Sequence, residues 1–312
     1  MRAQLIISTR NRAKFLQMTL ESALAQSVPF RRIIVSDNSS KSGAHVGEMN
    51  HLKQGLRETK LVRFIKPSQE LLPHEHLKFI QNRYIPNDQS LSVVFHDDDE
   101  FCIDYHKEIL KAFEQKQSCV AVSCNAIILK GLMKTNHTLM RTNFGTKTFI
   151  SKLEFFNHYF GFNPIAPPPF SAYCYRSDVF KNLNFSPDIG GKYSDVAGLS
   201  QLLDHGSIFW INTPLIKYRF HENQDSNQNH IVARRKLLRY AKAQIEESKL
   251  INMSAAYRTK YLMSKLSFKR QHARRSIFIF NYISTIFLKE MITSGQFYKF
   301  LWVALFRKER RS

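Results

Sequence analysis

The first hundred residues alternate short apolar runs with stretches of helical spacing, and this alternation constrains the fold more than any other feature. Apolar runs that predict strands occur at residues 4–8, 32–36, 61–65 and 91–95. Helical spacing lies between them, at residues 13–26, 45–59 and 74–84. Strands that alternate with helices predict an α/β fold, in which a mainly parallel sheet carries helices on both faces.

Polar residues directly follow three of these predicted strands. Thr9, Arg10 and Asn11 follow the first strand, residues 37–39 (Asp-Asn-Ser) follow the second, and residues 96–100 (His-Asp-Asp-Asp-Glu) follow the fourth. Ligands of open α/β sheets bind outside the carboxyl ends of the strands. We therefore expect these polar residues to line one site.

The acidic run at residues 97–100 predicts a metal site. A divalent cation relieves the repulsion among neighbouring carboxylates, and oxygen ligands suit Mg²⁺ or Mn²⁺, which also retain phosphate oxygens and water. In an extended turn, Asp97 and Asp99 face one metal and its nucleotide while Asp98 faces elsewhere. The alternatives are a solvent-exposed acidic loop or a cap for the helix expected at residues 103–116.

Four further polar residues each have a functional and a structural interpretation. Asp37 suits a hydrogen bond to a base or ribose, but the run Asp-Asn-Ser-Ser also suits a turn. Asn11 belongs to the same site or forms a helix N-cap. Asp195 opens a predicted helix, either as a helix-terminal carboxylate or as the general base for an acceptor hydroxyl. His221 is either a surface residue or a ligand of metal or diphosphate.

In their order along the chain, these motifs resemble the family 2 glycosyltransferases with the GT-A fold. The segments that carry the resemblance are ISTRNR, SDNSS, VVFHDDDEF, YSDVAGLSQLL and PLIKYRFHENQDS, within residues 1 to about 226. Two segments depart from the family pattern. The helix before the fourth strand, HEHLKFIQNR, lacks the Arg-Asn pair that the family often has there, so His74, His76 or Arg63 is expected to replace the donor contact of that arginine. Ser194 rather than Glu precedes Asp195, which leaves Asp188 as an alternative base.

The resemblance implies an inverting hexosyltransferase that moves a sugar from a nucleotide-sugar, UDP-linked by family analogy, to a hydroxyl. It implies Asp195 as the catalytic base, with Mn²⁺ or Mg²⁺ held by Asp97, Asp99 and His221. The residues expected to bind the donor are Thr9, Arg10, Asn11, Asp37, Arg63, Asp97 and Asp98.

The net charge of +21 is concentrated in the C-terminal quarter of the chain. Residues 231–312 hold 19 of the 46 Lys and Arg residues but only 4 of the 25 Asp and Glu residues. We therefore predict a transferase domain at residues 1–226 and a basic amphipathic helical region at residues 227–312. Apolar stretches at 277–288 and 297–306 are too short to span a bilayer, and their basic flanks suit in-plane binding to an anionic membrane. The alternative is packing on the transferase domain or on a second copy of the chain.

A membrane-bound transferase suggests a lipid-linked glycan acceptor, in the synthesis of a surface polysaccharide such as O-antigen or capsule. The four cysteines have no metal-binding spacing and are expected to be reduced thiols, and the first residues lack the pattern of a secretory leader. We therefore expect a cytoplasmic protein that is peripheral on the inner membrane.

The basic charge and the acidic run also suit a nucleic-acid-binding protein or a metal-dependent nucleotidyl- or phosphotransferase. However, the basic residues lie apart from the carboxylates, and no nucleic-acid-binding module is recognisable. We therefore expect no nucleic-acid partner.

Overall fold

The computed structural model describes residues 2–43, 45–57, 59–140, 145–160, 168–220 and 231–245. The predicted ligand His221 and the predicted membrane-binding stretches at 277–288 and 297–306 lie outside the described residues. The chain divides into two compact units. The first comprises Met1–Ser151 with Ile165–Leu237, and the second comprises Lys152–Pro164 with Leu238–Ser312.

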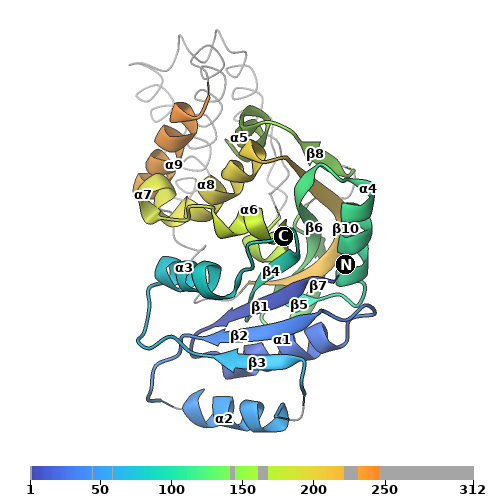
Figure 1. Cartoon of the computed structure of the whole chain (residues 1–312), viewed down its shortest axis with the longest axis vertical. Helices are drawn as coiled ribbons and strands as arrows, with labels where there is room; N and C mark the ends of the chain where they lie inside the picture. Colours follow the sequence, from blue (N-terminus) through green and yellow to red (C-terminus); the bar gives the residue numbers. More distant parts are fainter. Residues whose placement is uncertain are drawn as a thin grey trace, which may run out of the picture. The chain divides into compact units, whose positions relative to one another are not determined.

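The described part of the first unit is built on a ten-stranded mixed sheet (Figure 1). Its main order is β3-β2-β1-β4-β9-β6-β10-β5, with β7 paired to β6 and β8 paired to β10. The strands are β1 (Gln4–Thr9), β2 (Arg32–Asp37), β3 (Val62–Ile65), β4 (Leu91–His96), β5 (Glu100–Phe101), β6 (Cys119–Lys130), β7 (Met133–Thr138), β8 (Lys147–Phe149), β9 (Cys174–Arg176) and β10 (Ser207–Phe220).

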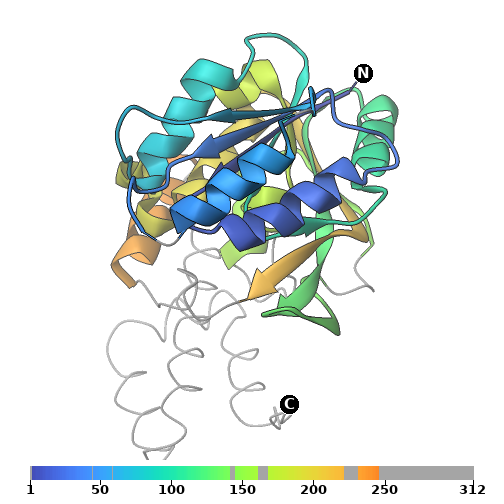
Figure 2. The ribbon, with the colours of Figure 1, turned by 90° about the horizontal axis from the view of Figure 1, so that it is seen from below.

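The first half of the sheet is parallel, and successive strands are added first on one side of β1 and then on the other. The chain runs from β1 through β2 to β3 at the edge, then returns to β4 on the other side of β1. Because parallel crossovers are right-handed, this reversal places α1 (Ala13–Leu24) and α2 (His45–Gly55) on one face and α3 (Pro73–Tyr84) on the other, as Figure 2 shows. The space between β1 and β4 is therefore a topological switch point, where such folds bind ligands.

Burial on both faces explains the apolar sequences of β1, β2 and β4. All but one residue of each strand is buried, so the strands read as apolar runs instead of alternating patterns. Helix α1 covers one face of this region with Ala13, Leu16, Leu20 and Ala23, which are buried at helical spacing. The predicted strands and helices of the first hundred residues are thus confirmed within a few residues at their ends.

The second half of the sheet is held together by the long strand β10. Strand β10 runs from Ser207 to Phe220, so it includes the first part of the PLIKYRFHENQDS segment of the family resemblance, and it pairs in parallel with β6. Its register shifts around Pro214, which has no N–H to donate to a ladder. Beyond this irregularity, Lys217 pairs with Glu100 of the short antiparallel strand β5. This strand pairing holds Glu100, the last residue of the acidic run, against β10.

The remaining helices are α4 (Tyr105–Gln115), α5 (Lys152–Phe160), α6 (Ser177–Lys181), α7 (Pro187–Gly190), α8 (Ser194–Gln201) and α9 (Ile231–Ala243). Three of these helices, α5, α6 and α7, lie outside the regions predicted to be helical. The helix predicted at residues 195–204 is α8 followed by a 3₁₀ turn, Leu202–Asp204. The strands β5, β7, β8 and β9 were not predicted, because segments of two to six residues are too short or too polar to show a clear strand pattern.

Helix α9 is the described part of the predicted basic region. Ala233, Leu237 and Ala241 recur every four residues and are buried, while Arg235 and Arg239 are exposed. Within the second unit, Lys152 Nζ donates a 2.8 Å hydrogen bond to Gln244 Oε1. Over the ranges that the structure describes, no helix combines the length and the apolar character needed to cross a membrane.

Candidate donor and metal site

The carboxyl ends of β1, β2 and β4 bring the predicted polar residues together. In the strand register Thr9 lies beside Asp37, and Ser8 lies beside His96, which immediately precedes the acidic run. The backbone N–H of Arg10 lies 3.4 Å from Asp97 Oδ2, which joins the end of β1 to the loop after β4. The predicted convergence of these strand ends is therefore present at the switch point.

The acidic run is buried. Asp97, Asp98 and Asp99 are 0%, 7% and 1% exposed, so the alternative of a solvent-exposed acidic loop is wrong. The loop does not cap α4 either, because the N-cap position of that helix is Asp104. Burying three neighbouring carboxylates is costly unless cations or hydrogen-bond donors compensate their charge.

Arg12 neutralises part of this charge. Its Nη2 atom lies 2.7 Å from Asp97 Oδ1, and its Nη1 atom forms an ion pair with Asp98 Oδ2. Burial raises the pKa of Asp97 to about 6, although Arg12 opposes this shift. Arg12 therefore links Asp97 to Asp98 through ion pairs, although Oδ1 of Asp97 accepts no hydrogen bond within the described residues.

Two segments that are remote in sequence fix the carboxylate of Asp99. Ser171 Oγ donates a 2.6 Å hydrogen bond to Oδ2, and the backbone N–H of Arg219 donates a 3.0 Å bond to Oδ1. The side chain of Arg219 also donates to the carbonyl of Asp98 and pairs with Glu100. Burial, reinforced by the charge of Asp98, raises the pKa of Asp99 well above its usual range.

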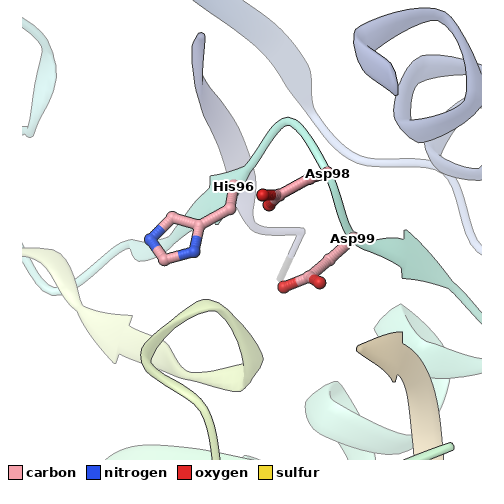
Figure 3. Close-up of side chains that lie close together, drawn as sticks. All are labelled: His96, Asp98 and Asp99. Carbon is pink, nitrogen blue, oxygen red and sulfur yellow. The ribbon is translucent and has the colours of Figure 1, made fainter. Parts of the chain in front are cut away.

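His96, Asp98 and Asp99 form a group that fits a divalent cation (Figure 3). Each residue offers one ligand atom, and these atoms lie within 4.8 Å of one another. Ligands on opposite sides of Mg²⁺ are about 4.2 Å apart, so a small adjustment closes the group around one ion. The chain turns at residues 97 and 98 instead of running extended, so Asp98 rather than Asp97 joins Asp99. The participation of Asp97 and His221 in metal binding stays a prediction.

Asp37 is held as an ionised carboxylate at the end of β2. The backbone N–H of Ser39 donates to Oδ1 at 3.0 Å, and Lys53 Nζ donates to Oδ2 at 3.0 Å. Burial alone would raise the pKa of Asp37, but these two partners outweigh it and lower the pKa below its usual value. Each oxygen retains a lone pair that can accept a further hydrogen bond from a ligand.

Asn11 connects the loops after β1 and β2. Its backbone has φ +58, a left-handed conformation that Asn tolerates better than most residues. Its N–H donates to Ser39 Oγ at 2.8 Å, and its Oδ1 accepts from the N–H of Ser40 at 3.0 Å. The alternative that Asn11 caps α1 is wrong, because Arg12 occupies the N-cap position and its side chain makes no capping bond.

The candidates for the missing arginine contact lie in different places. His76 is buried behind β2, with Nε2 2.7 Å from Ser36 Oγ, and burial lowers its pKa to about 4. Arg63 is exposed on the edge strand β3, and its charge acts on Arg32 at the amino end of β2. The structure does not bring Arg63 to the cluster at the carboxyl ends.

The environments of the two candidate bases differ. Asp195 opens α8, and its Oδ1 atom is buried and accepts no hydrogen bond within the part of the chain that the structure describes. Burial raises the pKa of Asp195 to about 6. Burial also raises the pKa of Tyr173, and the charge of Asp195 adds to that shift. Asp188 is exposed, and its backbone N–H donates to Ser186 Oγ at 3.2 Å. The short segment from Ser171 to Tyr173 thus interacts with both carboxylates: Ser171 donates a hydrogen bond to Asp99, and Tyr173 lies within the electrostatic influence of Asp195.

Five residues of this site were given no individual role from the sequence. Arg12 and Arg219 lie inside the segments that carry the family resemblance, but no rule of spacing singled them out. His96 belongs to the polar run after the fourth strand but was given no role of its own. Ser171 and Lys53 belong to no motif, and only the folded chain brings them to Asp99 and Asp37.

The fold is the GT-A type of α/β fold, which confirms the predicted fold class. The solved structures to which the chain is similar include S. aureus TarS 1–349, with a TM-score of 0.57 and 12% identity over 98% of this chain and 81% of that one. Complexes of the same protein with UDP and with UDP-GlcNAc give TM-scores of 0.59 and 0.58, also at 12% identity. The chain spans 49% of the longer TarS chain. No protein-family model and no curated protein matches the sequence.

Proposed function

We propose that this chain is an inverting glycosyltransferase that moves a sugar from a UDP-linked donor to an acceptor hydroxyl. The observation that carries this proposal is the convergence of Asp37 with the buried acidic run at the switch point between β1 and β4. The same fold binds UDP and UDP-GlcNAc in TarS.

The loops after β1 and β2 hold the nucleotide in this proposal. Asp37 accepts hydrogen bonds from the base, and Lys53 and Ser39 fix its orientation before the donor binds. Thr9, Arg10 and Asn11 line the adjoining strand end. A carboxylate that is already oriented and ionised loses little conformational freedom on binding, which favours affinity.

Asp98 and Asp99 hold the cation in this proposal, with Asp97 and His221 as further members of the donor and metal site. A bound Mn²⁺ or Mg²⁺ supplies positive charge against the diphosphate leaving group. Arg12 orients Asp97 and Asp98, while Ser171 and Arg219 orient Asp99. These contacts set the direction of the carboxylates before the donor arrives.

Asp195 takes the proton of the attacking hydroxyl in this proposal. A base with a pKa of about 6 is ionised at neutral pH and is still basic enough to accept a proton. Asp188 is exposed, whereas Asp195 has a buried carboxylate oxygen that accepts no hydrogen bond within the described residues, so Asp195 is the better candidate. A metal-assisted leaving group needs no second acidic residue, and one carboxylate is sufficient for displacement with inversion.

The acceptor that we propose is a lipid-linked glycan in surface-polysaccharide synthesis. The basic residues of the C-terminal region support attachment to an anionic membrane surface on the cytoplasmic side. The alternative is that the same region packs against a second copy of the chain. Flotation with anionic vesicles, compared between the full chain and a chain ending at residue 269, separates the two.

The test of the transferase proposal is product analysis. The protein is first titrated with UDP, GDP, dTDP and CMP, with and without Mn²⁺, and then incubated with the matching nucleotide-sugars and lipid-linked acceptors. We expect metal-dependent UDP binding, release of UDP and an inverted glycosidic product by NMR. Release of UMP or pyrophosphate would instead indicate a nucleotidyl- or phosphotransferase, and no nucleotide binding would exclude both.

A further inference from the structure

We propose that the imidazole of His96 is a direct ligand of the cation, together with Asp98 and Asp99, and that its nitrogen makes the site prefer Co²⁺ and Mn²⁺ over Mg²⁺. This inference deepens the proposed function, because the same cation would serve the donor diphosphate. Its test measures metal binding and does not depend on sugar transfer.

The position of His96 directs its ring to the two carboxylates. His96 is the last residue of β4, so its backbone is fixed by pairing with Ser8 of β1. One ring nitrogen lies within 4.8 Å of a carboxylate oxygen of Asp98 and of Asp99. Figure 3 shows the three side chains close together. Three ligand atoms from one short segment therefore surround a common point.

An aromatic contact fixes the orientation of the imidazole. The ring stacks on Phe170, with centroids 6.1 Å apart and an interplanar angle of 25°. Phe170 in turn packs edge-on against Phe185 at 5.5 Å. This support limits rotation of the His96 ring, much as outer contacts orient the histidine ligands of other metal sites.

The ring nitrogens of His96 are not used by the protein. Within the described residues, neither nitrogen makes a hydrogen bond or an ion pair, whereas the buried His76 and His106 both do. A neutral imidazole presents one nitrogen lone pair. The alternative is that His96 only packs against Phe170. Any aromatic ring could do this, so packing alone does not explain why a ring nitrogen lies close to both carboxylates.

The chemistry of the ligand set determines its metal preference. Mg²⁺ binds oxygen almost exclusively and retains its water, whereas imidazole nitrogen suits later divalent ions. Affinity for nitrogen-containing sites rises from Mn²⁺ to Co²⁺. A site with only Asp98 and Asp99 would lack this nitrogen contribution, so His96 is expected to set the difference between Co²⁺ and Mg²⁺.

The experiment compares wild-type protein with His96→Phe, which preserves the stack on Phe170, and with His96→Asn, which is smaller and polar. His137→Phe is the control, since His137 is exposed on β7. Calorimetric titrations with Co²⁺ and Mg²⁺ are run with and without UDP. We expect both His96 variants to lose at least about tenfold in Co²⁺ affinity, with much less effect on Mg²⁺. An unchanged ratio of the two affinities would overturn the inference.

Pulsed EPR of bound Mn²⁺ provides a second readout, the number of imidazole nitrogens coupled to the ion. We expect this number to fall by one in His96→Phe and to be unchanged in His137→Phe. His221→Phe retains His96, so a nitrogen coupling that persists there supports the inference even if the His96 variants fail to fold. Complete loss of coupling in His221→Phe would overturn it. Sugar transfer without any nitrogen coupling would support the proposed function and overturn the role of His96. Nitrogen coupling without sugar transfer would support the role of His96 and overturn the proposed function.

Discussion

Ser171 Oγ donates a 2.6 Å hydrogen bond to Oδ2 of Asp99, although the two residues lie 72 positions apart in the chain. The bond joins the 3₁₀ turn Phe170–Ala172 to the loop after β4. Both side chains are buried, and Arg219 N–H holds the second oxygen of Asp99. The direction of this carboxylate is therefore set by two segments that are distant from it in the sequence.

Removing this hydrogen bond should destabilise the metal-free protein. We expect Ser171→Ala to lower the free energy of unfolding by about 1–3 kcal/mol, because a buried carboxylate loses a donor. Urea denaturation in the presence of a chelator measures the change. Ser123→Ala is the matched control, since Ser123 Oγ is buried and has no hydrogen-bond partner in the described ranges. Equal destabilisation by the two variants would contradict the role assigned to Ser171.

Replacing Asp195 should separate binding from chemistry. We expect Asp195→Asn to retain UDP binding and to lose about 10²–10⁴-fold in transfer rate, which is the usual contribution of a general base. Calorimetry and UDP release measure the two properties. Asp188→Asn, at an exposed position, should change neither. If Asp188→Asn instead abolished transfer, the assignment of the base would be reversed.

The pKa of Asp195 predicts the pH dependence of transfer. Burial raises this pKa to about 6, and only the ionised carboxylate can accept a proton. The rate should therefore rise as the pH increases through about 6 and level off above it. Measurements of kcat/KM between pH 5 and 8 would show this limb. A rate that stays constant down to pH 5 would be incompatible with a base of this pKa.

His106 should make the stability of the fold pH-dependent at a place remote from the acidic run. Its Nε2 accepts the N–H of Ala3 at 3.0 Å, and Nδ1 lies 2.8 Å from the carbonyl of Val28, so Nδ1 carries the proton. Burial lowers the pKa of His106, because the charged ring would lose its hydration. A proton on Nε2 would also place a second N–H against the N–H of Ala3.

The sign of this effect follows from proton binding. As the pH falls below about 6.5, the unfolded chain binds a proton at His106 that the folded chain does not. Folding should therefore lose stability by up to about 1.4 kcal/mol per pH unit until the folded pKa is reached. Urea denaturation at pH 7.5 and 5.5 should show a smaller loss for His106→Gln than for wild type. The same loss in both proteins would show that His106 is protonated in the folded state.

Asp37 should contribute to donor affinity and not to the chemical step. We expect Asp37→Asn to weaken UDP binding by about 10- to 100-fold, the equivalent of one hydrogen bond to a charged group. Transfer at saturating donor should change little. Asp104→Asn, which alters an exposed carboxylate beside Ser27, is the control. Unchanged UDP affinity in Asp37→Asn would remove Asp37 from the donor site.

The order of the strands and the residues at their ends could be read from the sequence. The apolar runs at β1, β2 and β4 are continuous because these strands are buried on both faces, and a parallel sheet places their polar ends together. This local and periodic information was sufficient to predict an α/β fold with a mainly parallel sheet and to bring Thr9, Asp37 and Asp97 to one edge, whereas the GT-A type came from the family resemblance. Periodicity was not sufficient for the second half of β10, which is interrupted at Pro214 and was expected to be a strand only from that resemblance.

Only the tertiary structure decided how the acidic run is arranged. Alternation along an extended segment would pair Asp97 with Asp99, but the chain turns at residues 97 and 98 and groups Asp98 and Asp99 with His96. Arg12, Ser171 and Arg219 come from three separate segments, and each contacts different carboxylate oxygens of this run. The sequence by itself determined which strand-end residues meet at the site, because the ends of parallel strands lie at one edge of the sheet. Long-range contacts, which no local pattern encodes, added Ser171 and Lys53 and determined the direction of each carboxylate.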